Sequence, residues 1–377
     1  MSAIYYKKLE EVCEILDSRR VPITAKNRKT GIYPYYGANG LQDYVAEYIF
    51  DDELVLLAED GGNFGSKERP IAYRVSGKCW VNNHAHVLKA KPLVNADYLC
   101  YALMFYDTEG LVNGATRQKL TQTAMRQMMI PYRNMTEQLQ IADEINQVIR
   151  LIDKRKEELS LLDQLVKSRF IELFGDMYLN SLEWTEVSLE SISDIVSGIT
   201  KGRKIKTAEL REVPYMAVSN VKNGYIDWTT VKTIEVTEQE LNQYRLLPDD
   251  VLMTEGGDPD KVGRGAIIRE PLENCIHQNH IFRVRFNERD ILPVFFAEYL
   301  QHQRAKRYFL GCAKQTTGIA SINMKQLRNL PVLMPPLELQ RQFAVFVTQT
   351  DKSKLAVEKS LKQLEILKKS LMQQYFG

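Results

Sequence analysis

The sequence predicts an α+β chain in which two α/β domains, in a pseudo-two-fold arrangement, alternate with two long antiparallel helices that form a coiled coil. Two observations support this prediction. The stretch from Glu137 to Gly175 returns without a gap as Leu339 to Gly377, and self-similarity of this kind indicates an internal repeat. The segments between the two copies differ in residues but keep the same order of sequence features. The chain is therefore predicted to be a tandem duplication.

Both copies of the repeat have the periodicity of a long helix. In the first copy, apolar residues recur at heptad spacing from Ile141 to Leu173, and charged residues occupy the other faces, which is typical of a coiled coil. The second copy repeats this pattern, but Thr350, Lys354 and Lys368 interrupt it. We predict that the seam between the helices contains Ile145, Val148, Ile152, Leu159, Leu162, Val166, Val347, Val357, Leu361, Leu364 and Leu371.

The ends of the repeated helices are marked by residues with known terminal preferences. Asn134 and Glu137 have the spacing of a capping box, and Gly175 and Gly377 suit a helix end. A helix of this size is roughly 50 Å long, and duplicated units that pack about a two-fold axis set their helices antiparallel. The predicted boundaries are 1–135 and 176–336 for the domains, and 136–175 and 337–377 for the helical spacers.

The two domain segments share a skeleton of short elements. Each is predicted to open with an amphipathic helix, at 6–15 and at 187–195. An apolar strand then leads into a glycine-rich loop that contains Glu59 or Glu255, and a second strand ends at a paired Asn-His. Helices are predicted near 97–106 and 293–307. Short strands between glycine-rich turns, followed by helices, favour an α+β domain.

Composition restricts the class of protein. Lys and Arg number 50 and Asp and Glu 48, a net charge of +2, so any contact with a polyanion must depend on local patches or on partners. The five cysteines are scattered without a C-x-x-C pair, which predicts neither a disulfide framework nor a zinc knuckle. No apolar stretch is long enough for a membrane span. We expect a cytoplasmic protein.

Enzyme motifs and metal sites are not predicted. The segment Gly61–Lys67 resembles a phosphate-binding loop but lacks its spacing, and the only Pro-Pro pair, at 335–336, lacks the Asn and aromatic residue of an adenine methyltransferase motif. His84 and His86 are spaced to face one side of a strand, as metal ligands do, but no nearby carboxylate or cysteine completes a set. The matched Asn83-His84 and Asn279-His280 pairs are interpreted as a shared turn.

The order of segments resembles the specificity subunits of type I restriction-modification enzymes, in which two target-recognition domains alternate with two conserved helical regions. The resemblance covers essentially the whole chain. It depends on the Pro34–Gly40 run, on Trp80–His84, and on the prolines Pro131, Pro331 and 335–336 ahead of each helix. In that family the subunit has no catalytic activity, reads a split DNA sequence and recruits modification and restriction subunits.

The resemblance implies the partners and cofactors. The expected function is recognition of an asymmetric bipartite site in double-stranded DNA, with one half-site for each domain and a spacer set by the helices. Two methyltransferase subunits, which use S-adenosylmethionine, and the ATP-driven restriction subunits are the expected partners; this chain itself is expected to bind no cofactor and no membrane. Two alternatives stay open: the specificity subunit of a related combined cleavage-methylation system, and a coiled-coil scaffold without a DNA role.

Basic and amide side chains in glycine-containing loops are the candidates for DNA contact, because Lys and Arg bind phosphates while Arg, Asn and Gln read base edges. In the first domain these are Lys26, Arg28, Lys29, Asn63, Lys67, Arg69, Arg117, Gln118 and Lys119. In the second domain they are Lys201, Arg203, Lys204, Lys206, Lys222, Lys261, Arg264, Lys314 and Gln315. Arg117, Gln118, Lys314 and Gln315 rank highest because they occupy matched places ahead of the helices.

Overall fold

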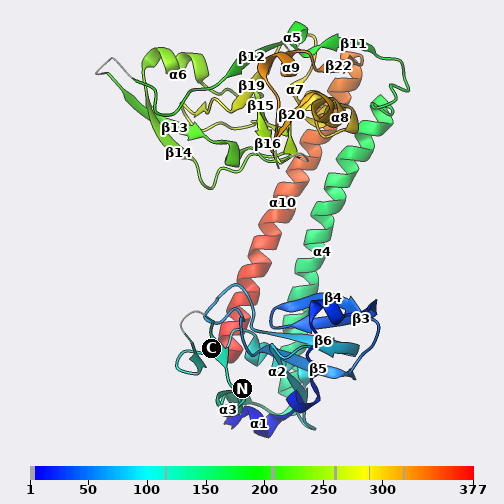
Figure 1. Cartoon of the computed structure of the whole chain (residues 1–377), viewed down its shortest axis with the longest axis vertical. Helices are drawn as coiled ribbons and strands as arrows, with labels where there is room; N and C mark the ends of the chain where they lie inside the picture. Colours follow the sequence, from blue (N-terminus) through cyan, green and yellow to red (C-terminus); the bar gives the residue numbers. More distant parts are fainter. Residues whose placement is uncertain (1–4, 115–116, 205–208, 259–260, 288, 317–318) are drawn as a thin grey trace. The chain divides into compact units, whose positions relative to one another are not determined.

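The chain forms two compact units, each built around one sheet-containing domain (Figure 1). The computed structural model describes residues 5–114, 117–204, 209–258, 261–287, 289–316 and 319–377. Unit 1 contains Met1–Glu157 and Glu358–Gly377, and unit 2 contains Glu158–Val357. Each unit therefore combines one α/β domain with part of each long helix. The segments predicted as helical spacers are divided between the two units.

Unit 1 is organised around a six-stranded sheet with the order β2-β7-β5-β6-β3-β4. The sheet is antiparallel except where β3 pairs with β6 in parallel. Ahead of the long helices, the described elements are β1 (Tyr5–Lys8), α1 (Leu9–Val12), β2 (Cys13–Ile15), η1 (Asp17–Arg19), η2 (Ala25–Asn27), β3 (Thr30–Gly37), β4 (Gly40–Val45), β5 (Phe50–Ala58), β6 (Ala72–Val81), β7 (Ala85–Ala90), α2 (Ala96–Met104), β8 (Val112–Asn113), β9 (Lys119–Leu120), α3 (Gln122–Arg126) and β10 (Met129–Tyr132).

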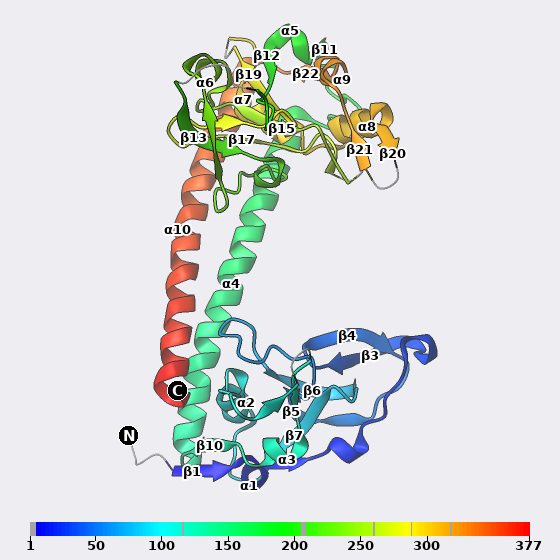
Figure 2. The ribbon, with the colours of Figure 1, turned by 60° about the vertical axis from the view of Figure 1, so that its left-hand side comes forward.

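The central strand β5 is buried on both faces. Val55 and Leu57 belong to one apolar cluster with residues of α2, whereas Leu54 and Leu56 belong to another with Phe50. Successive side chains of a strand point to opposite faces, so a continuous apolar run is required where both faces are covered. Figure 2 shows α2 against this sheet.

Unit 2 repeats this plan with more, smaller sheets. Their orders are β12-β19-β15-β17, β14-β13-β18, β16-β21-β20 and β11-β22. Its described elements between the long helices are β11 (Thr185–Ser188), α5 (Leu189–Ile192), β12 (Ser193–Ser197), β13 (Arg211–Met216), η3 (Val218–Asn220), β14 (Lys232–Val236), α6 (Glu238–Tyr244), β15 (Val251–Thr254), β16 (Gly256–Gly257), β17 (Gly265–Ile267), β18 (Ile276–His277), β19 (Ile281–Phe286), α7 (Pro293–Tyr299), α8 (Gln303–Cys312), β20 (Lys314–Thr316), β21 (Ile319–Ser321), α9 (Met324–Arg328) and β22 (Pro331–Met334).

Three predicted helices are wrong in extent. The amphipathic helices expected at 6–15 and 187–195 are single turns, α1 and α5, each between two strands. Their flanking residues pair with distant strands, β1 with β10 and β11 with β22, and this long-range pairing overrides the local helical pattern. The helix expected at 293–307 is two helices, because the chain turns at His302, whose ring lies 4.5 Å from that of Phe170.

The two long helices, α4 (Met135–Phe174) and α10 (Leu337–Phe376), have 40 residues each. In unit 2 the Lys354 ammonium lies 2.6 Å from Asp163 Oδ1, and the Phe343 and Phe170 rings are 5.3 Å apart. Residue numbers thus rise along one helix as they fall along the other, which confirms the antiparallel arrangement. As predicted, Asn134 caps α4, because its Oδ1 accepts from the Glu137 N–H at 3.0 Å.

The predicted seam residues are buried to different degrees. Seven of them are buried: Ile145, Val148, Ile152, Val166, Val347, Val357 and Leu371. The other four are only half-buried: Leu159, Leu162, Leu361 and Leu364. Apolar burial is the main driving force for helix pairing. The seven buried residues therefore contribute more to the stability of the helices than the four half-buried ones.

The Phe-Gly ending of each repeat has a packing role. Phe174, at the end of α4, lies in the core of unit 2, 4.8 Å from the Phe295 ring. Phe376, at the end of α10, lies in unit 1, 5.1 Å from the Tyr98 ring. Each long helix thus begins in the unit of the domain that precedes it and ends in the other unit.

Two further expectations can be compared with the structure. All five cysteines are free thiols, in agreement with the prediction that they form no disulfide framework. Within the described ranges, no helix is both long and apolar enough to cross a membrane.

Candidate nucleic-acid interface

Three segments of unit 1 meet at the carboxyl end of β5. The Glu59 N–H donates to His84 O at 2.9 Å, and Glu59 O accepts from the Leu120 N–H at 2.7 Å. His84 belongs to the turn between β6 and β7, and Leu120 ends β9. Backbone hydrogen bonds therefore fix the loop after β5 between the Asn-His turn and the segment ahead of α3. The Asn-His pair lies in a turn, as predicted.

An acidic, a basic and a histidine side chain gather on the surface of this junction. Asp60 Oδ1 lies 2.6 Å from His84 Nδ1 and accepts from Arg117 Nη2 at 2.7 Å. Gly61 has a φ of +62°, and a Cβ at this position would lie 3.5 Å from Arg117 Nε. The Arg117 side chain is nevertheless 60% exposed. The Asp60 carboxylate, with the His84 ring 3.3 Å from Nη2, thus orients a guanidinium on a largely exposed side chain.

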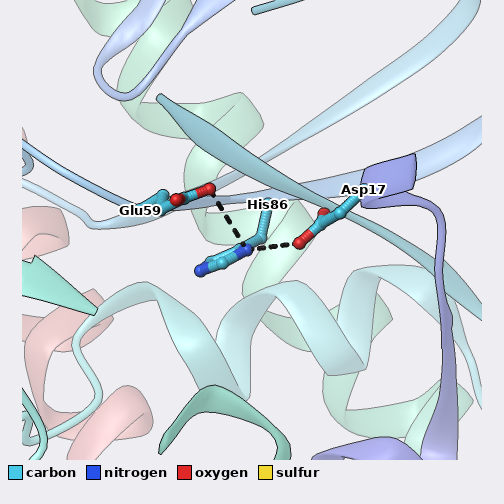
Figure 3. A group of neighbouring side chains, drawn as sticks. All are labelled: Asp17, Glu59 and His86. Carbon is cyan, nitrogen blue, oxygen red and sulfur yellow. Dashed lines mark hydrogen bonds and ion pairs between the residues drawn. The ribbon is translucent and has the colours of Figure 1, made fainter. Parts of the chain in front are cut away.

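A buried ionic cluster lies beneath this surface (Figure 3). His86 Nδ1 is 2.6 Å from Asp17 Oδ2 and 3.7 Å from Glu59 Oε2. Glu59 also pairs with Arg20 at 2.6 Å and with Lys119 at 3.0 Å. Burial raises the pKa of both carboxyl groups, but hydrogen bonds from His86 to Asp17, and from Arg20 and Lys119 to Glu59, outweigh it, so that both pKa values are lowered. Both groups are therefore carboxylates at neutral pH.

The same cluster has the composition of a metal site. Asp17, Glu59 and His86 each place one ligand atom within 4.8 Å of the others, although the sequence suggested no carboxylate to complete a set around His86. Its second ring nitrogen, Nε2, lies 2.9 Å from Leu120 O. Both ring nitrogens of His86 thus already face protein oxygens within hydrogen-bond distance, which leaves neither nitrogen open to a metal. The geometry fits a buried ion pair.

Unit 2 has the same backbone junction at the end of β15. The Glu255 N–H donates to His280 O at 3.0 Å, and Glu255 O accepts from the Ile322 N–H at 2.8 Å. The Glu255 carboxylate lies 2.5 Å from His280 Nδ1. An open cavity of 380 Å³ is lined by Val218, Glu255, Gly256, His280 and Ser321. Glu255 and His280 are the structural equivalents of Glu59 and His84.

The inner residues of the two junctions differ. Strand pairing places Ile15 opposite Leu88 in unit 1 and Ile195 opposite Val284 in unit 2. By this register Asp17 corresponds to Ser197 and His86 to Phe282. Ser197 and Phe282 pair directly across β12 and β19. Two members of the ionic cluster of the first domain therefore have neutral counterparts in the second, whereas Glu59 corresponds to Glu255.

Comparison with known proteins identifies the family. The family model for the type I restriction modification DNA specificity domain matches residues 2–161 and 181–366. The chain belongs to this family. A type I restriction enzyme specificity subunit of Haemophilus influenzae is 26% identical over 98% of this chain and 96% of its own length. The EcoKI specificity subunit of Escherichia coli is 21% identical over 86% of this chain and 74% of its own.

A solved structure supports the fold of this member of the specificity family. The type I S subunit from M. genitalium has a TM-score of 0.60 and 16% identity, over 100% of this chain and 96% of its own. The match agrees with the predicted architecture of two α/β recognition domains and two long helices. The family is one of specificity subunits, which are generally non-catalytic.

In the first recognition domain, the predicted DNA-contact residues fall into two groups. One group lies at the junction or in the loop after β5: Asn63, Lys67, Arg69, Arg117, Gln118 and Lys119. The other lies around η2: Lys26, Arg28 and Lys29. Arg28 is half-buried over the Tyr35 ring, 4.1 Å from its centroid, and lies 3.3 Å from Asp43. Its packing suggests a structural role besides any contact with DNA.

The second recognition domain shows more varied environments. Lys201, Lys204 and Lys314 are exposed, Lys222 is half-buried and lies 4.0 Å from Asp227, and Lys261 pairs with Asp258. Arg203 donates to Glu240 at 2.5 Å and lowers the pKa of that carboxyl to about 2, which marks a structural ion pair. Arg264 is half-buried in the loop before β17. Lys206 and the side chain of Gln315 lie outside the described residues.

The matched segments ahead of α3 and α9 are hairpins. In unit 1, β8 pairs with β9, and Asn113 lies opposite Lys119. In unit 2, β20 pairs with β21, and Lys314 lies opposite Ser321. Lys314 therefore corresponds to Asn113, whereas Arg117 and Gln118 lie on the other arm of their hairpin. The four highest-ranked residues therefore belong to equivalent hairpins, but the pair in unit 1 and the pair in unit 2 lie on opposite arms and not at matched places.

Sequence reasoning missed the acidic residues of both junctions. Asp60 and Glu255 stand directly after the apolar strands, in the glycine-rich loops that the sequence marked as turns. A signal was present, because Glu59 and His84 are spaced along the chain as Glu255 and His280 are. Carboxylates were not sought as contact residues, since the search for DNA contacts favoured cations and amides.

Proposed function

We propose that this chain recognises an asymmetric bipartite site in double-stranded DNA, one half-site for each recognition domain. The observation that carries the proposal is the pair of equivalent junctions, which share their backbone hydrogen bonds and differ in side chains. A common frame with different polar groups is what two readers of different sequences require. The cations around the junctions supply phosphate contacts, although the net charge is only +2.

The long helices are proposed to set the gap between the half-sites and to dock partner subunits. Each helix has 40 residues, about 60 Å at the usual rise. Apolar side chains stay exposed on both, among them Leu161 at 55% and Leu165 at 49% on α4, and Val345 at 59%, Leu355 at 65% and Ile366 at 60% on α10. Apolar surface of this kind is typical of protein interfaces.

A groove in unit 2 adds to this docking surface. It has a volume of 430 Å³ and is lined by Arg169, Val345, Phe346 and their neighbours on the two helices. We propose that two methyltransferase subunits, which bind S-adenosylmethionine, occupy such surfaces, and that ATP-driven restriction subunits join the complex. The chain itself is proposed to hold no cofactor, to be non-catalytic and to act in the cytoplasm.

The first test is the DNA sequence that the chain selects. The full chain, with and without its methyltransferase partner, is mixed with a randomised duplex pool at two salt concentrations, since nonspecific binding depends steeply on salt. We expect a bipartite motif with two different halves. Replacing Arg117 or Lys314 by alanine should weaken recognition of one half by about 1–3 kcal/mol.

The matched control is Lys325→Ala, because Lys325 is an exposed cation on α9, outside the hairpin. That variant should select the same motif as the parent chain. If no duplex is selected under any of these conditions, the DNA role is wrong and the scaffold alternative stands. A motif cut as well as methylated by the complex would favour the combined cleavage-methylation alternative.

The second test concerns the gap between half-sites. The Lys354–Asp163 ion pair identifies the heptads to remove together, Glu157–Asp163 from α4 and Lys354–Ser360 from α10. Seven residues of helix correspond to about 10 Å, or about three base pairs. The paired deletion should shorten the selected gap by that amount and leave both halves unchanged. A gap of unaltered length would rule out a spacer role for the helices.

A further inference from the structure

The exposed side chains of the two junctions differ in hydrogen-bonding character, with donors prominent in unit 1 and acceptors in unit 2. In unit 1 the Asp60–His84 pair carries a third member, Arg117, 2.7 Å from Asp60. In unit 2 Gly256 stands at the position of Asp60, and Ser321 at that of Lys119. Among the residues that the structure describes, the Glu255 carboxylate has one hydrogen-bonding partner, His280. The first junction thus exposes a cation, from the segment before β9, whereas the second exposes an acid, from the loop after β15.

The first junction is suited to hydrogen-bond acceptors. A guanidinium carries five N–H donors in a planar fork, and Asp60 engages only one of its nitrogens, Nη2. The remaining donors belong to a side chain that is 60% exposed. Guanine presents two adjacent acceptors, O6 and N7, in the major groove, and a planar fork binds both at once.

The second junction is suited to hydrogen-bond donors. His280 Nδ1 faces Glu255 Oε2 at 2.5 Å, so this carboxylate oxygen accepts from the ring nitrogen. The second carboxylate oxygen, Oε1, is a further acceptor. The two side chains are 56% and 33% exposed and line the open cavity of 380 Å³. In the major groove the donors are the amino groups of adenine and cytosine.

We propose that the Glu255–His280 pair reads the exocyclic amino group of a cytosine or adenine in one half-site, while Arg117, held by Asp60, reads a guanine in the other. This inference rests on the proposed bipartite recognition and adds the chemistry of one base in each half. It gives the two domains complementary roles, because equivalent junctions bind an acceptor edge in one and a donor edge in the other.

The test changes single functional groups of the DNA bases. The full chain is bound to its selected duplex, and analogues lacking the amino group replace each adenine (by purine) or cytosine (by the 4-deamino base) of the half-site read by unit 2. One replacement should weaken binding of the parent chain about tenfold or more, the range for loss of a good base contact. The same replacement should have little effect on Glu255→Gln, because the contact is already lost.

The reciprocal arm uses 7-deazaguanine, which lacks N7, in the other half-site. One substitution should weaken binding of the parent chain and have little effect on Arg117→Lys, since an ammonium lacks the planar fork. Glu270→Gln is the matched control, because Glu270 is an exposed carboxylate in a turn of unit 2 away from the cavity. It should keep the full response to every analogue.

The outcomes separate the two proposals. Failure to select any duplex overturns the proposed function. Selection of a bipartite duplex, with analogue and residue effects that simply add, overturns this inference alone, because groups in contact are non-additive. If Glu255→Gln lowers the thermal unfolding midpoint, His280→Gln serves as a second variant for the unit 2 contact. If the effects of the DNA analogues and of the substitution add for both variants, the inference is also wrong.

Discussion

The two recognition domains hold the same loop in place by different chemistry. In the first, a buried His86–Asp17–Glu59 cluster lies under the junction, and in the second the corresponding positions hold Phe282, Ser197 and Glu255. The backbone hydrogen bonds of the two junctions agree within about 0.1 Å. The difference shows that the junction depends on main-chain pairing, which tolerates either an ionic or a neutral pair at the positions of His86 and Asp17.

The two interiors are expected to differ in how strongly a single substitution destabilises the domain. Ions removed from water need their partners, and the loss of one member leaves an uncompensated charge. A neutral interior loses only the transfer energy of the removed atoms and one hydrogen bond. The first domain is therefore expected to be more sensitive to a single substitution at this place than the second.

The largest effect is predicted for Asp17→Ala. Asp17 accepts from His86 at 2.6 Å, from the Val87 N–H at 2.8 Å and from Gln122 at 3.0 Å. Its removal should lower the stability of unit 1 by about 3–5 kcal/mol. Chemical denaturation followed by hydrogen exchange of β7 peptides measures this loss.

The matched substitution in unit 2 is Ser197→Ala. Ser197 donates one hydrogen bond, to Asn279 O at 2.7 Å, so a loss of about 1 kcal/mol is expected. Equal losses in the two units would contradict the proposed difference between an ionic and a neutral interior.

A pH response is predicted for unit 2, from His277. Its Nδ1 lies 3.0 Å from Ile281 O, its Nε2 has no partner among the described residues, and burial lowers its pKa from 6.5 to about 4. Since the unfolded chain binds the proton more readily, the stabilisation is complete above pH 6.5 and is lost as the pH falls toward 4. The full loss amounts to about 3 kcal/mol.

The first domain supplies the matched variant for this response. Strand pairing puts Val81 of β6 where unit 2 has His277, because Tyr36 and Met216 are their respective partners. His277→Val should flatten the pH dependence of exchange in β18 and β15 between pH 7 and 5. The lowered pKa values of Asp17 and Glu59 act at more acidic pH, below the ordinary carboxyl range. An unchanged pH profile in His277→Val would assign the response to another group.

The sequence allowed the architecture to be predicted more fully than the site. The repeat indicated both long helices and their termini at Asn134 and Gly175, because capping and heptad spacing are local signals. The contact between Asp17 and His86 was not predictable, since strand pairing joins residues far apart in the chain. Arg117 was selected as a candidate because its segment resembles one ahead of α9, whereas its partner Asp60 was missed because an acidic residue after a strand also suits an ordinary turn.

The smallest predicted effects on stability concern glutamines that are identical in the two copies of the repeat, of which one pair is buried and another is exposed. Gln138 and Gln340 are both fully buried. Gln138 accepts from the Asn95 N–H at 2.8 Å and donates to Arg133 O at 2.8 Å and Leu93 O at 3.1 Å. Gln340 accepts from the Leu292 N–H and donates to Pro335 O, each at 2.8 Å. Both amides tie the start of a long helix to the loop ahead of α2 or α7.

Replacing either glutamine by alanine leaves buried main-chain groups unpaired, which should cost about 1–3 kcal/mol in its own unit. Gln138→Ala should lower the stability of its unit more than Gln340→Ala, because it breaks three hydrogen bonds rather than two and releases Leu93, which has a φ of +70°.

Gln147 and Gln349 are also identical between the copies but are exposed. Their alanine variants should therefore change the stability by no more than about 0.5 kcal/mol. Hydrogen exchange of α2 and α7 peptides distinguishes the two units. If Gln147→Ala destabilised unit 1 as much as Gln138→Ala, the repeated glutamines would share a role other than this buried clamp, such as a common docking surface.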